Sequence, residues 1–564
     1  MSKLKKSDWW KKSVVYQVYP KSFKDTNGDG IGDIPGIIEK LPYIKELGAD
    51  VIWLNPIYKS PYVDNGYDIS DYKEVHEDFG TMDDFDELLK KAHEMGLKII
   101  LDLVVNHTSS EHPWFKKSKE STLNQYRDYY IWKHAKNGEL PTNWGSSFGG
   151  STWEYVDAVG QYYLHLFAKE QPDLNWENPK VREEVYEIMR YWLNKGIDGF
   201  RMDVINLISK KPEYPNGEVI NRKIYGSYYD GAANGPRVHE FLNEMNQKVL
   251  SHYDVMTVGE TPHTNADEAL LYCDADRKEL DMVFHFDHMH LDYGPYGKFT
   301  DKKAKMSDLR DVLSHWQYKM ADKGWNSLYW SNHDQARPVS RFGDDVNYRV
   351  ESAKMLGTLL HMLKGTPYIF EGEEIGMTNV RFQSIADYDD IETHNIYKEF
   401  NEVHHLDHEF IMASIHAKSR DNARTPMQWD NSLNAGFSEG TPWLKLNPNY
   451  TEINVHNALG DKHSVFYYYK KLIALRKEYD VIVNGDYQLV CEDNPDAYSY
   501  IRKNDKETLL VICSFSTEEQ PFNVPEDLAA KENSLLISNY DGNEDQELCK
   551  ISLKPYEARV YLLK

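Results

Sequence analysis

The sequence predicts an α/β fold, a (β/α)8 TIM barrel with a loop-rich subdomain inserted after its third strand and an antiparallel β-domain at its C-terminus. Three observations predict this fold. Apolar runs alternate with amphipathic segments over most of the 564 residues, which is typical of a parallel α/β fold. The apolar runs are continuous rather than alternating, as expected for strands buried on both faces. Several runs end in polar residues, which would converge at one mouth if the strands close a barrel.

Eight apolar runs are expected to form the barrel strands, and amphipathic segments between them are expected to form helices. In the segment 81–96, Thr81 is the predicted N-cap and Gly96 the predicted terminator. The other predicted helices cover residues 34–47, 178–196 and 464–477. The predicted strands cover residues 14–20, 51–56, 98–107, 199–205, 256–260, 282–286, 327–334 and 366–376.

The alternation of strands and helices stops after the third strand and again near residue 480. Residues 108–174 are rich in Ser, Gly, Trp and Tyr and show no βα repeat. From about residue 481 the pattern changes to short alternating strands such as LLVICSF and ARVYLL, typical of an antiparallel sheet. We therefore expect a catalytic barrel over 1–107 and 175–480, an inserted subdomain B over 108–174 and a C-terminal β-sandwich over 481–564.

Composition limits the classes of partner and compartment. The net charge of −25 argues against nucleic acid, whose phosphates would be repelled. No stretch approaches the roughly 18 apolar residues of a membrane span, and the N-terminal segment lacks the apolar core of a secretory signal. The cysteines, Cys273, Cys491, Cys513 and Cys549, are far apart and predict neither a disulfide framework nor a zinc site. We expect a cytoplasmic protein, a monomer or weak oligomer, with no membrane partner.

Three predicted strands end in carboxylates: Asp203 in GFRMDVI, Glu260 in VMTVGE and Asp334 in SLYWSNHD. Neighbouring strands lie about 4.8 Å apart, and retaining glycoside hydrolysis needs two carboxyl groups about 5–5.5 Å apart. We therefore expect Asp203 to attack the anomeric carbon, and Glu260 to protonate the leaving oxygen before it deprotonates water. Asp334 would bind sugar hydroxyls more strongly in the transition state than in the ground state.

Three further polar residues at the strand ends would support this chemistry. Arg201 lies two residues before Asp203 and therefore points to the same side of the strand, where its charge could keep Asp203 ionised. His107 ends the third predicted strand and His333 precedes Asp334, so both could donate hydrogen bonds to the same sugar ring. The partner expected from this chemistry is a small oligosaccharide.

Four of these segments resemble the signature regions of glycoside hydrolase family 13, the α-amylase family. They are DLVVNH (102–107), GFRMDVI (199–205), TVGE (257–260) and SNHD (331–334). Through QPDLNWENPKVR, GTPYIFEGEEIGMTN and RDNARTPMQWD, the chain most resembles the oligo-1,6-glucosidase (isomaltase) and dextran glucosidase group. The resemblance implies the same roles for the three carboxylates. It further implies a retaining, exo-acting α-glucosidase that releases glucose from the non-reducing end of isomaltose and short α-1,6-linked oligosaccharides.

The resemblance also implies residues that bind the substrate. Asp64 of DNGYD and Arg420 of RDNAR would pair across the sugar at the closed end of the pocket, and Tyr67 would stack on that glucose. Val204, directly after Asp203, goes with α-1,6 specificity in this group, whereas smaller residues or Thr go with α-1,4 specificity. The residues expected to line the sugar sites on both sides of the scissile bond are Phe148, Phe167, Gln171 and Glu392.

Other substrates remain open: sucrose or isomaltulose, α-1,4 maltooligosaccharides and trehalose-6-phosphate. Sucrose isomerases carry an RLDRD motif, and the corresponding HLDYG (290–294) lacks both arginines. VINLISK (204–210) and VSRFGDD (339–345) resemble trehalose-6-phosphate hydrolases, which must bind a phosphate with basic residues, and only Lys210 and Lys211 are candidates. The chain departs from the group at Ala336, where Pro is usual, and at Glu371, where Gln is usual.

The segment DTNGDGIGD (25–33) predicts a metal site. Alternating oxygen ligands with intervening glycines resemble the first part of an EF-hand loop. Hard oxygen ligands without His or Cys favour Ca²⁺, with Mg²⁺ as the alternative. Because the segment follows the first strand, we expect a structural rather than a catalytic ion. The expected ligands are the side chains of Asp25, Asn27, Asp29 and Asp33 and the backbone carbonyl of Ile31.

Overall fold

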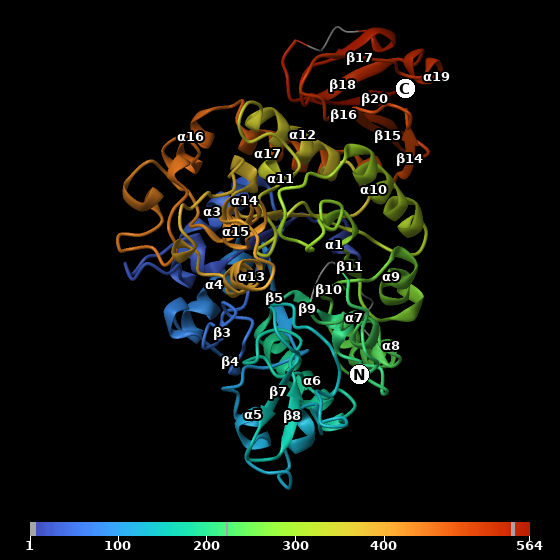
Figure 1. Cartoon of the computed structure of the whole chain (residues 1–564). Coiled ribbons are helices and arrows are strands. Elements are labelled where there is room, and N and C mark those ends of the chain that lie inside the picture. The colour runs from blue at the N-terminus through green and yellow to red at the C-terminus, as the bar shows by residue number, and fades with distance from the viewer. Residues whose placement is uncertain (1–6, 221–223, 543–546) are drawn as a thin grey trace.

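The computed structural model describes residues 7–220, 224–542 and 547–564, and its centre is an eight-stranded parallel sheet (Figure 1). The strands are hydrogen-bonded in the order β11-β10-β9-β5-β2-β1-β13-β12. A parallel bridge between Val283 and Asn326 joins the two ends, so the sheet closes and the predicted TIM barrel is confirmed. The barrel strands are β1 Val15–Val18, β2 Val51–Leu54, β5 Lys98–Val104, β9 Gly199–Asp203, β10 Met256–Glu260, β11 Met282–Phe284, β12 Ser327–Leu328 and β13 Thr366–Phe370.

The prediction of a strand over 327–334 was wrong in its length. β12 ends at Leu328, and Asp334 lies in the loop that follows. The apolar residues beyond β12 are buried for another reason. The Tyr329 hydroxyl donates to the carbonyl of His285 at 2.6 Å, and the Trp330 indole N–H donates to the carbonyl of Leu356 at 2.8 Å. These side chains anchor the loop without strand pairing, which an apolar pattern alone does not reveal.

The four predicted helices are α3 Ile34–Leu47, α4 Met82–Glu94, α6 Pro179–Lys195 and α17 Val465–Glu478. Thr81 begins α4 with a capping box, because its hydroxyl accepts from the N–H of Asp84 and the Asp84 carboxylate accepts from the N–H of Thr81. Gly96 follows the C-cap of α4 with a positive φ of 69°. Other helices of eight residues or more are α8 Val238–Lys248, α9 Ala266–Cys273, α10 Met306–Met320, α12 Arg349–His361, α13 Ile391–Glu402 and α14 His408–Lys418.

The insertion after β5 carries a short helix, α5 Pro113–Ser118, and a small antiparallel sheet in the order β6-β8-β7. These strands are β6 Trp132–Lys133, β7 Trp153–Val156 and β8 Gln161–Leu164. Further strands outside the barrel are β3 Tyr58–Lys59 and β4 Asp71–Val75, which pair with each other. In Figure 1 the sheet of the insertion lies below the barrel.

The predicted antiparallel β-domain follows the barrel and lies above it in Figure 1. Its larger sheet has the order β14-β15-β16-β20-β18, and β17 and β19 form a second, two-stranded sheet. The larger sheet packs on α12: the Tyr500 hydroxyl donates to the carbonyl of Leu359 at 2.7 Å, and Arg502 Nη1 donates to the carbonyl of Met362 at 2.6 Å. The strands are β14 Asp486–Val490, β15 Ala497–Lys503, β16 Thr508–Ser514, β17 Gln520–Phe522, β18 Asn533–Ser538, β19 Ile551–Leu553 and β20 Ala558–Leu563. The residue boundaries expected between domains stay predictions.

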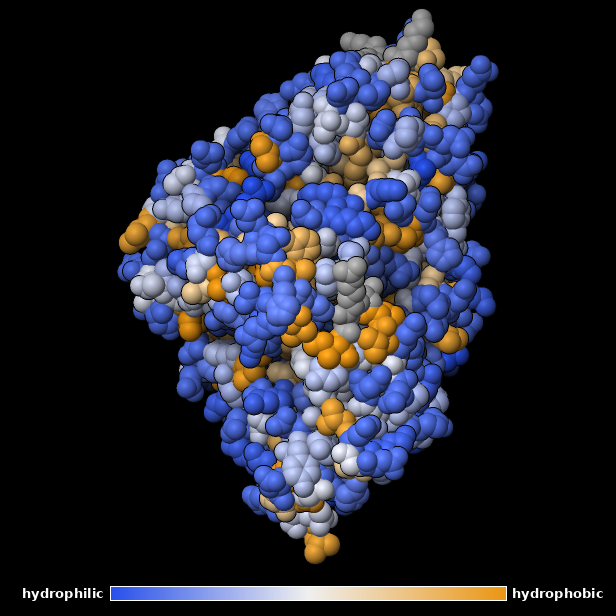
Figure 2. Space-filling model, in the orientation of Figure 1, coloured by the Kyte–Doolittle hydropathy of each residue, from blue (hydrophilic) through white to orange (hydrophobic). Residues whose placement is uncertain are grey.

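The surface is mostly hydrophilic on the face shown in Figure 2, with hydrophobic residues gathered near its centre. In the described ranges, no helix combines the length and apolar character needed to cross a membrane. All four cysteines are free thiols, and Cys273 and Cys513 are buried.

Glu371, which follows β13, is a buried acid with one unpartnered oxygen. Its Oε2 accepts a hydrogen bond from the N–H of Tyr19 at 2.8 Å, whereas its buried Oε1 has no hydrogen-bond partner among the described residues. Burial, aided by the nearby Glu374, raises the pKa of Glu371 well above its usual value although Arg337 lowers it. The folded protein therefore keeps this proton over a pH range in which the unfolded chain releases it.

We predict that Glu371→Gln stabilises the protein increasingly as the pH rises. Because the folded-state pKa is raised, the wild type has its full stability below the unfolded pKa of about 4.3 and loses it as the pH rises towards the folded pKa. An amide does not titrate, so the variant should gain roughly 2–5 kcal/mol at about pH 8 and only about 1 kcal/mol at about pH 5. Thermal midpoints across this range measure the effect. Exposed Glu532→Gln is the matched control, and a gain that is the same at every pH would contradict the explanation.

Candidate active site

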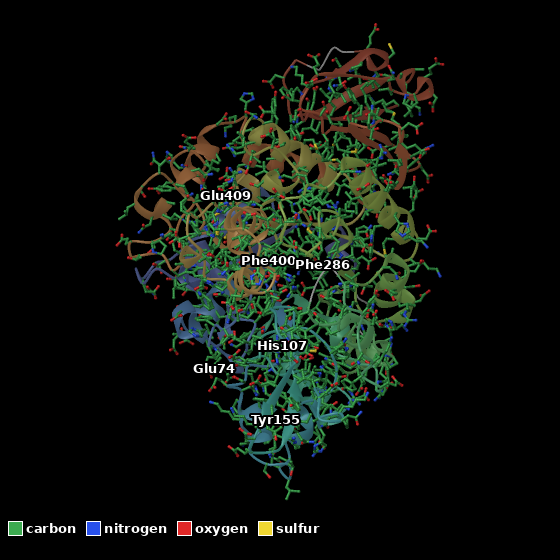
Figure 3. All side chains as sticks on the ribbon, viewed as in Figure 1. Glu74, His107, Tyr155, Phe286, Phe400 and Glu409 are labelled. Carbon is green, nitrogen blue, oxygen red and sulfur yellow. The ribbon has the colours of Figure 1, made fainter. Side chains whose placement is uncertain are left out.

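A pocket of about 180 Å³ opens at the carboxyl ends of the barrel strands and is lined by Asp203, Glu260 and Asp334. Eight other residues expected from the sequence line the same pocket: Asp64, Tyr67, His107, Phe148, Phe167, Val204, Glu392 and Arg420. In Figure 3, the labelled His107 lies between the barrel and the inserted sheet that carries Tyr155. The pocket therefore lies between the barrel mouth and the insertion.

Asp203 and Glu260 are the last residues of adjacent strands, β9 and β10, whose register pairs Met202 with Gly259. One guanidinium, that of Arg201, joins them. Its Nη1 lies 2.8 Å from Asp203 Oδ1 and 2.6 Å from Asp102 Oδ1, and its Nη2 lies 2.7 Å from Glu260 Oε2. Arg201 itself is buried beneath the pocket and does not line it.

Burial controls the acidity of both carboxyl groups. It raises the pKa of Asp203 to about 7 and the pKa of Glu260 to about 8, although Arg201 lowers both. Arg201 was expected to keep Asp203 ionised, but its single charge is shared with Asp102 and Glu260 and does not outweigh burial. Each carboxylate also raises the pKa of its neighbours, as expected when like charges share a dry site.

Asp334 differs from the other two because two arginines hold it. Its Oδ1 lies 3.2 Å from Arg420 Nη1 and 2.7 Å from Arg424 Nη2, and its Oδ2 lies 3.2 Å from His333 Nε2. Burial alone would raise the pKa of Asp334, but His333, Arg420 and Arg424 outweigh it and hold the pKa well below its usual range. Asp334 therefore stays ionised while Glu260 keeps its proton near neutral pH.

One end of the pocket is closed by the ion pair between Arg420 and Asp64, with Nη2 and Oδ1 3.1 Å apart. Arg420 also contacts Asp390 at 2.6 Å. Gln171, expected to line the pocket, lies behind it and donates to Asp64 Oδ2 at 3.0 Å. A sugar chain could therefore enter this end only by its terminal unit.

One further expected residue, His333, acts on the pocket through its neighbours. His333 is buried behind Tyr67, and their rings stack with centroids 5.0 Å apart and an interplanar angle of 3°. Its Nδ1 faces the side-chain amides of Gln17 at 3.0 Å and Asn55 at 3.1 Å. Burial lowers the pKa of His333 well below its usual value, so this ring is neutral near neutral pH and gains a charge that favours the Asp334 carboxylate only in acid. It holds Tyr67 and Asp334 in place from behind.

Val204 has a strained backbone between the two carboxyl groups. Its φ of 34° is a left-handed conformation that β-branched residues rarely adopt. In this conformation the N–H of Val204 donates a hydrogen bond to Glu260 Oε2 at 3.1 Å. The Val204 side chain lines the pocket and also packs in a buried cluster with Trp144 and Leu207.

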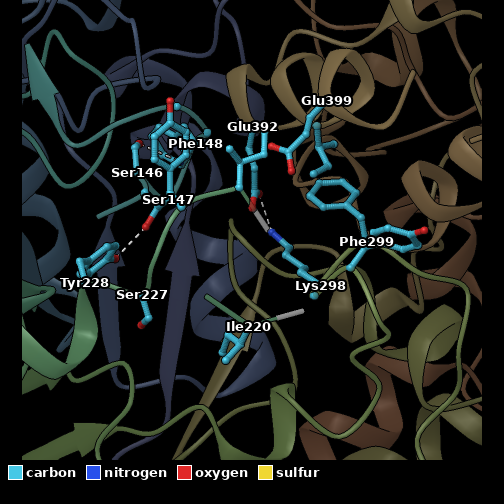
Figure 4. A pocket seen from close by; sticks show the side chains of 18 of the residues that line it. Ser146, Ser147, Phe148, Ile220, Ser227, Tyr228, Lys298, Phe299, Glu392 and Glu399 are labelled. Carbon is cyan, nitrogen blue, oxygen red and sulfur yellow. Dashed lines mark hydrogen bonds and ion pairs between the residues drawn. The ribbon is translucent and has the colours of Figure 1, made fainter. Parts of the chain in front are cut away.

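Sequence reasoning missed most of the residues at the open side of the pocket. Lys298 pairs with Glu392 at 2.6 Å there, and Ser147 bonds to Tyr228 (Figure 4). These residues come from loops and short helices that show no strand periodicity. Arg424, by contrast, could have been found, because it lies four residues after Arg420 in the same motif. The missed lining residues are Tyr228, Tyr229, Pro262, Phe286, His290, Tyr293, Lys298 and Gln335.

The predicted metal loop folds around its own side chains. The Asp25 carboxylate accepts hydrogen bonds from the N–H groups of Asn27, Gly28 and Gly30 and from the Ser438 hydroxyl. Among the residues that the structure describes, no three His, Cys, Asp or Glu side chains gather as a metal-binding group. Two side-chain oxygens on the exposed side of the loop, Asn27 Oδ1 and Asp29 Oδ1, still suit a hard cation. Each accepts only one hydrogen bond and keeps lone pairs free to bind a metal ion.

Residues 17–485 match the family described as "Alpha amylase, catalytic domain". The chain belongs to the α-amylase family. It is therefore a glycoside hydrolase, and its residues 487–560 match the C-terminal domain described for maltogenic amylase.

Several relatives of this α-amylase family enzyme cover its whole length. It is 60% identical to an oligo-1,6-glucosidase of Parageobacillus thermoglucosidasius, over 99% of both chains. It is 52% identical to a trehalose-6-phosphate hydrolase of Bacillus subtilis, over 100% of this chain and 99% of that one. The crystal structure of Bacillus licheniformis trehalose-6-phosphate hydrolase superimposes with a TM-score of 0.93 at 53% identity, over 99% of this chain and 100% of that one.

Proposed function

We propose that this glycoside hydrolase is a retaining, exo-acting α-glucosidase that releases glucose from the non-reducing end of isomaltose and short α-1,6-linked oligosaccharides. One observation carries the proposal: Asp203 and Glu260 end adjacent strands, share the guanidinium of Arg201, and lie in a pocket closed by the Asp64–Arg420 ion pair. The identity with relatives named oligo-1,6-glucosidase supports the linkage.

The geometry supports a double-displacement reaction. Asp203 attacks the anomeric carbon while Glu260 donates its proton to the leaving oxygen, which forms a glycosyl–enzyme ester. Glu260 then removes a proton from water, and the water oxygen displaces Asp203, which restores both groups. Asp334 remains charged throughout and binds ring hydroxyls, and its hydrogen bonds strengthen as positive charge develops on the ring.

The closed end of the pocket supports exo action. Arg420 is fixed by three carboxylates, those of Asp64, Asp334 and Asp390. Breaking a buried charge network of this kind costs roughly 3–5 kcal/mol. The substrate therefore meets a rigid wall one sugar beyond the scissile bond, and glucose is the product that fits.

Trehalose-6-phosphate is the second candidate because of the relatives with that activity in their names. A phosphate needs a cation free to bind it. Lys298 at the open side is paired with Glu392, and Lys210 is buried against Asp173 at 2.6 Å. Burial and the neighbouring His263 and Arg341 lower the pKa of His290 to about 4, so this pocket residue is neutral as well. These partners favour an uncharged sugar on the leaving side.

We predict that kcat/KM is highest for isomaltose and isomaltotriose, by about tenfold or more over maltose, sucrose, isomaltulose and trehalose-6-phosphate. Glucose release from this panel measures it. Val204→Thr keeps the branched shape and should raise the ratio of maltose to isomaltose turnover. Faster turnover of maltose or of trehalose-6-phosphate by the wild type would overturn the proposed substrate.

We predict a bell-shaped pH profile of kcat/KM. Activity should rise as Asp203 ionises through its pKa of about 7, and fall as Glu260 loses its proton through its pKa of about 8. α-Glucosyl fluoride has a leaving group that needs no proton, so the falling limb should disappear with that substrate. A falling limb that is equally steep with both substrates would contradict the role of Glu260.

We also propose that the loop 25–33 holds a structural Ca²⁺ through Asp25, Asn27, Asp29, Asp33 and the carbonyl of Ile31. Its hard oxygen donors and its position away from the pocket support a role in stability. We also propose that the protein is cytoplasmic, which its four free cysteines support, and that it is a monomer or weak oligomer.

We predict that a chelator lowers the thermal midpoint and that Ca²⁺ restores it, a gain of roughly 2–4 kcal/mol when the ion is well above its Kd. Mg²⁺ added alone distinguishes the two ions. Asp29→Asn keeps the oxygen that accepts the N–H of Ile31 but removes the charge, so it should weaken the calcium response. Exposed Asp505→Asn is the matched control. An identical midpoint with chelator and with Ca²⁺ would rule out the site.

A further inference from the structure

Figure 4 shows a second cavity, of about 380 Å³, which shares part of its lining with the catalytic pocket. Tyr229 and Lys298 line both cavities, whereas His263 lines only the outer one. Because the Asp64–Arg420 ion pair closes the other end, the leaving part of a substrate must extend in this direction. The sugar directly beyond the scissile bond would lie beside Tyr229, and a second sugar would lie in the outer cavity.

His263 has a backbone conformation that favours glycine. Its φ is 58°, and a non-glycine residue held there costs roughly 1–3 kcal/mol. Side-chain amides fix the segment in this shape. The Asn206 amide donates to the carbonyl of Pro262 at 2.8 Å, and the Thr264 hydroxyl donates to Asn234 Oδ1 at 3.1 Å. The fold therefore maintains a histidine, three residues after Glu260, where glycine would be less strained.

The imidazole of His263 is exposed, and its orientation is fixed by stacking. Its centroid lies 3.5 Å from that of Tyr229, with an interplanar angle of 27°. Tyr229 in turn lies 4.3 Å from Tyr228, and the Tyr228 hydroxyl hydrogen-bonds to Ser147 at 2.7 Å. Three rings thus lie in contact, with His263 stacked on Tyr229 and Tyr229 tilted against Tyr228, from the insertion to the rim of the outer cavity.

A flat ring of fixed orientation at the edge of a cavity is suited to the apolar face of a sugar. The basic residues Lys298 and His290 in its wall offer no free positive charge, because Lys298 is paired with Glu392 and the half-buried His290 is uncharged. An anion would therefore gain little there, whereas an uncharged pyranose would keep its hydroxyls towards the polar rim and its C–H face on the rings.

We propose that His263, held by Tyr229, is the specificity-determining platform for the second sugar unit beyond the scissile bond, so that trisaccharides are cleaved more efficiently than disaccharides. The inference deepens the proposed function and rests on it. His263 does not line the inner pocket, where the terminal glucose would lie. Its contribution therefore grows with chain length and is absent for a substrate without a leaving sugar.

The test compares kcat/KM for α-glucosyl fluoride, isomaltose and isomaltotriose in the wild type and two variants, His263→Gly and His263→Phe. Glycine relieves the backbone strain and removes the ring, so the thermal midpoint should not fall. The ratio of isomaltotriose to isomaltose should drop roughly 3- to 10-fold, as expected for the loss of one stacked ring. Phenylalanine keeps the flat ring and should preserve the ratio.

His405→Gly is the matched control, because this exposed histidine also has a positive φ, of 51°, and lies in the loop between α13 and α14. Its ratio should equal that of the wild type. An unchanged ratio in His263→Gly, or an equal loss with all three substrates, would overturn the proposal. If the wild type cleaves α-1,4 but not α-1,6 bonds, the proposed function fails while the platform is still tested, with maltotriose and maltose in place of the isomalto-sugars.

Discussion

The catalytic pocket depends on one buried cation. The guanidinium of Arg201 contacts Asp102, Asp203 and Glu260, and the last two are the reacting carboxyl groups of the proposed mechanism. A fully paired carboxylate would stay ionised, and an unpaired one would stay protonated. Sharing one charge among three leaves two groups that hold protons with different strength. Because one positive charge is too little for three carboxylates, Glu260 holds its proton more strongly than Asp203 does, which suits Glu260 as the acid and Asp203 as the nucleophile.

The second constraint is backbone strain placed just beyond the two strands that carry these groups. Val204 follows Asp203 directly, and His263 comes three residues after Glu260; both have left-handed backbones without being glycine. At Val204 the strain aims an N–H at Glu260, and at His263 it aims a ring at the outer cavity. Strain of this kind persists only where the surroundings over-determine the conformation. Around His263, the hydrogen bonds of the Asn206 and Asn234 side-chain amides hold the backbone in this conformation.

The sequence predicted the barrel well because its strands are buried on both faces and therefore read as continuous apolar runs. The same signal extended too far at 327–334, where Tyr329 and Trp330 are buried by anchoring a loop. Residues at strand ends or in long motifs could be predicted, including Asp203, Glu260 and Arg420. The open side of the pocket could not, because Tyr229, His290 and Lys298 lie in segments whose positions depend on tertiary packing. Sequence spacing also could not distinguish residues that line the pocket from those that support it, such as Gln171 and His333.

The contact between the C-terminal sheet and α12 has a consequence for how the chain can be divided. The last carbonyls of any helix lack partners within that helix. Near the end of α12, the carbonyls of Leu359 and Met362 receive theirs from Tyr500 and Arg502, which lie 141 and 140 residues later in the chain. Side chains of the C-terminal domain therefore cap the end of a barrel helix. Cutting the chain between the two parts would therefore leave the carbonyls of Leu359 and Met362 without these partners.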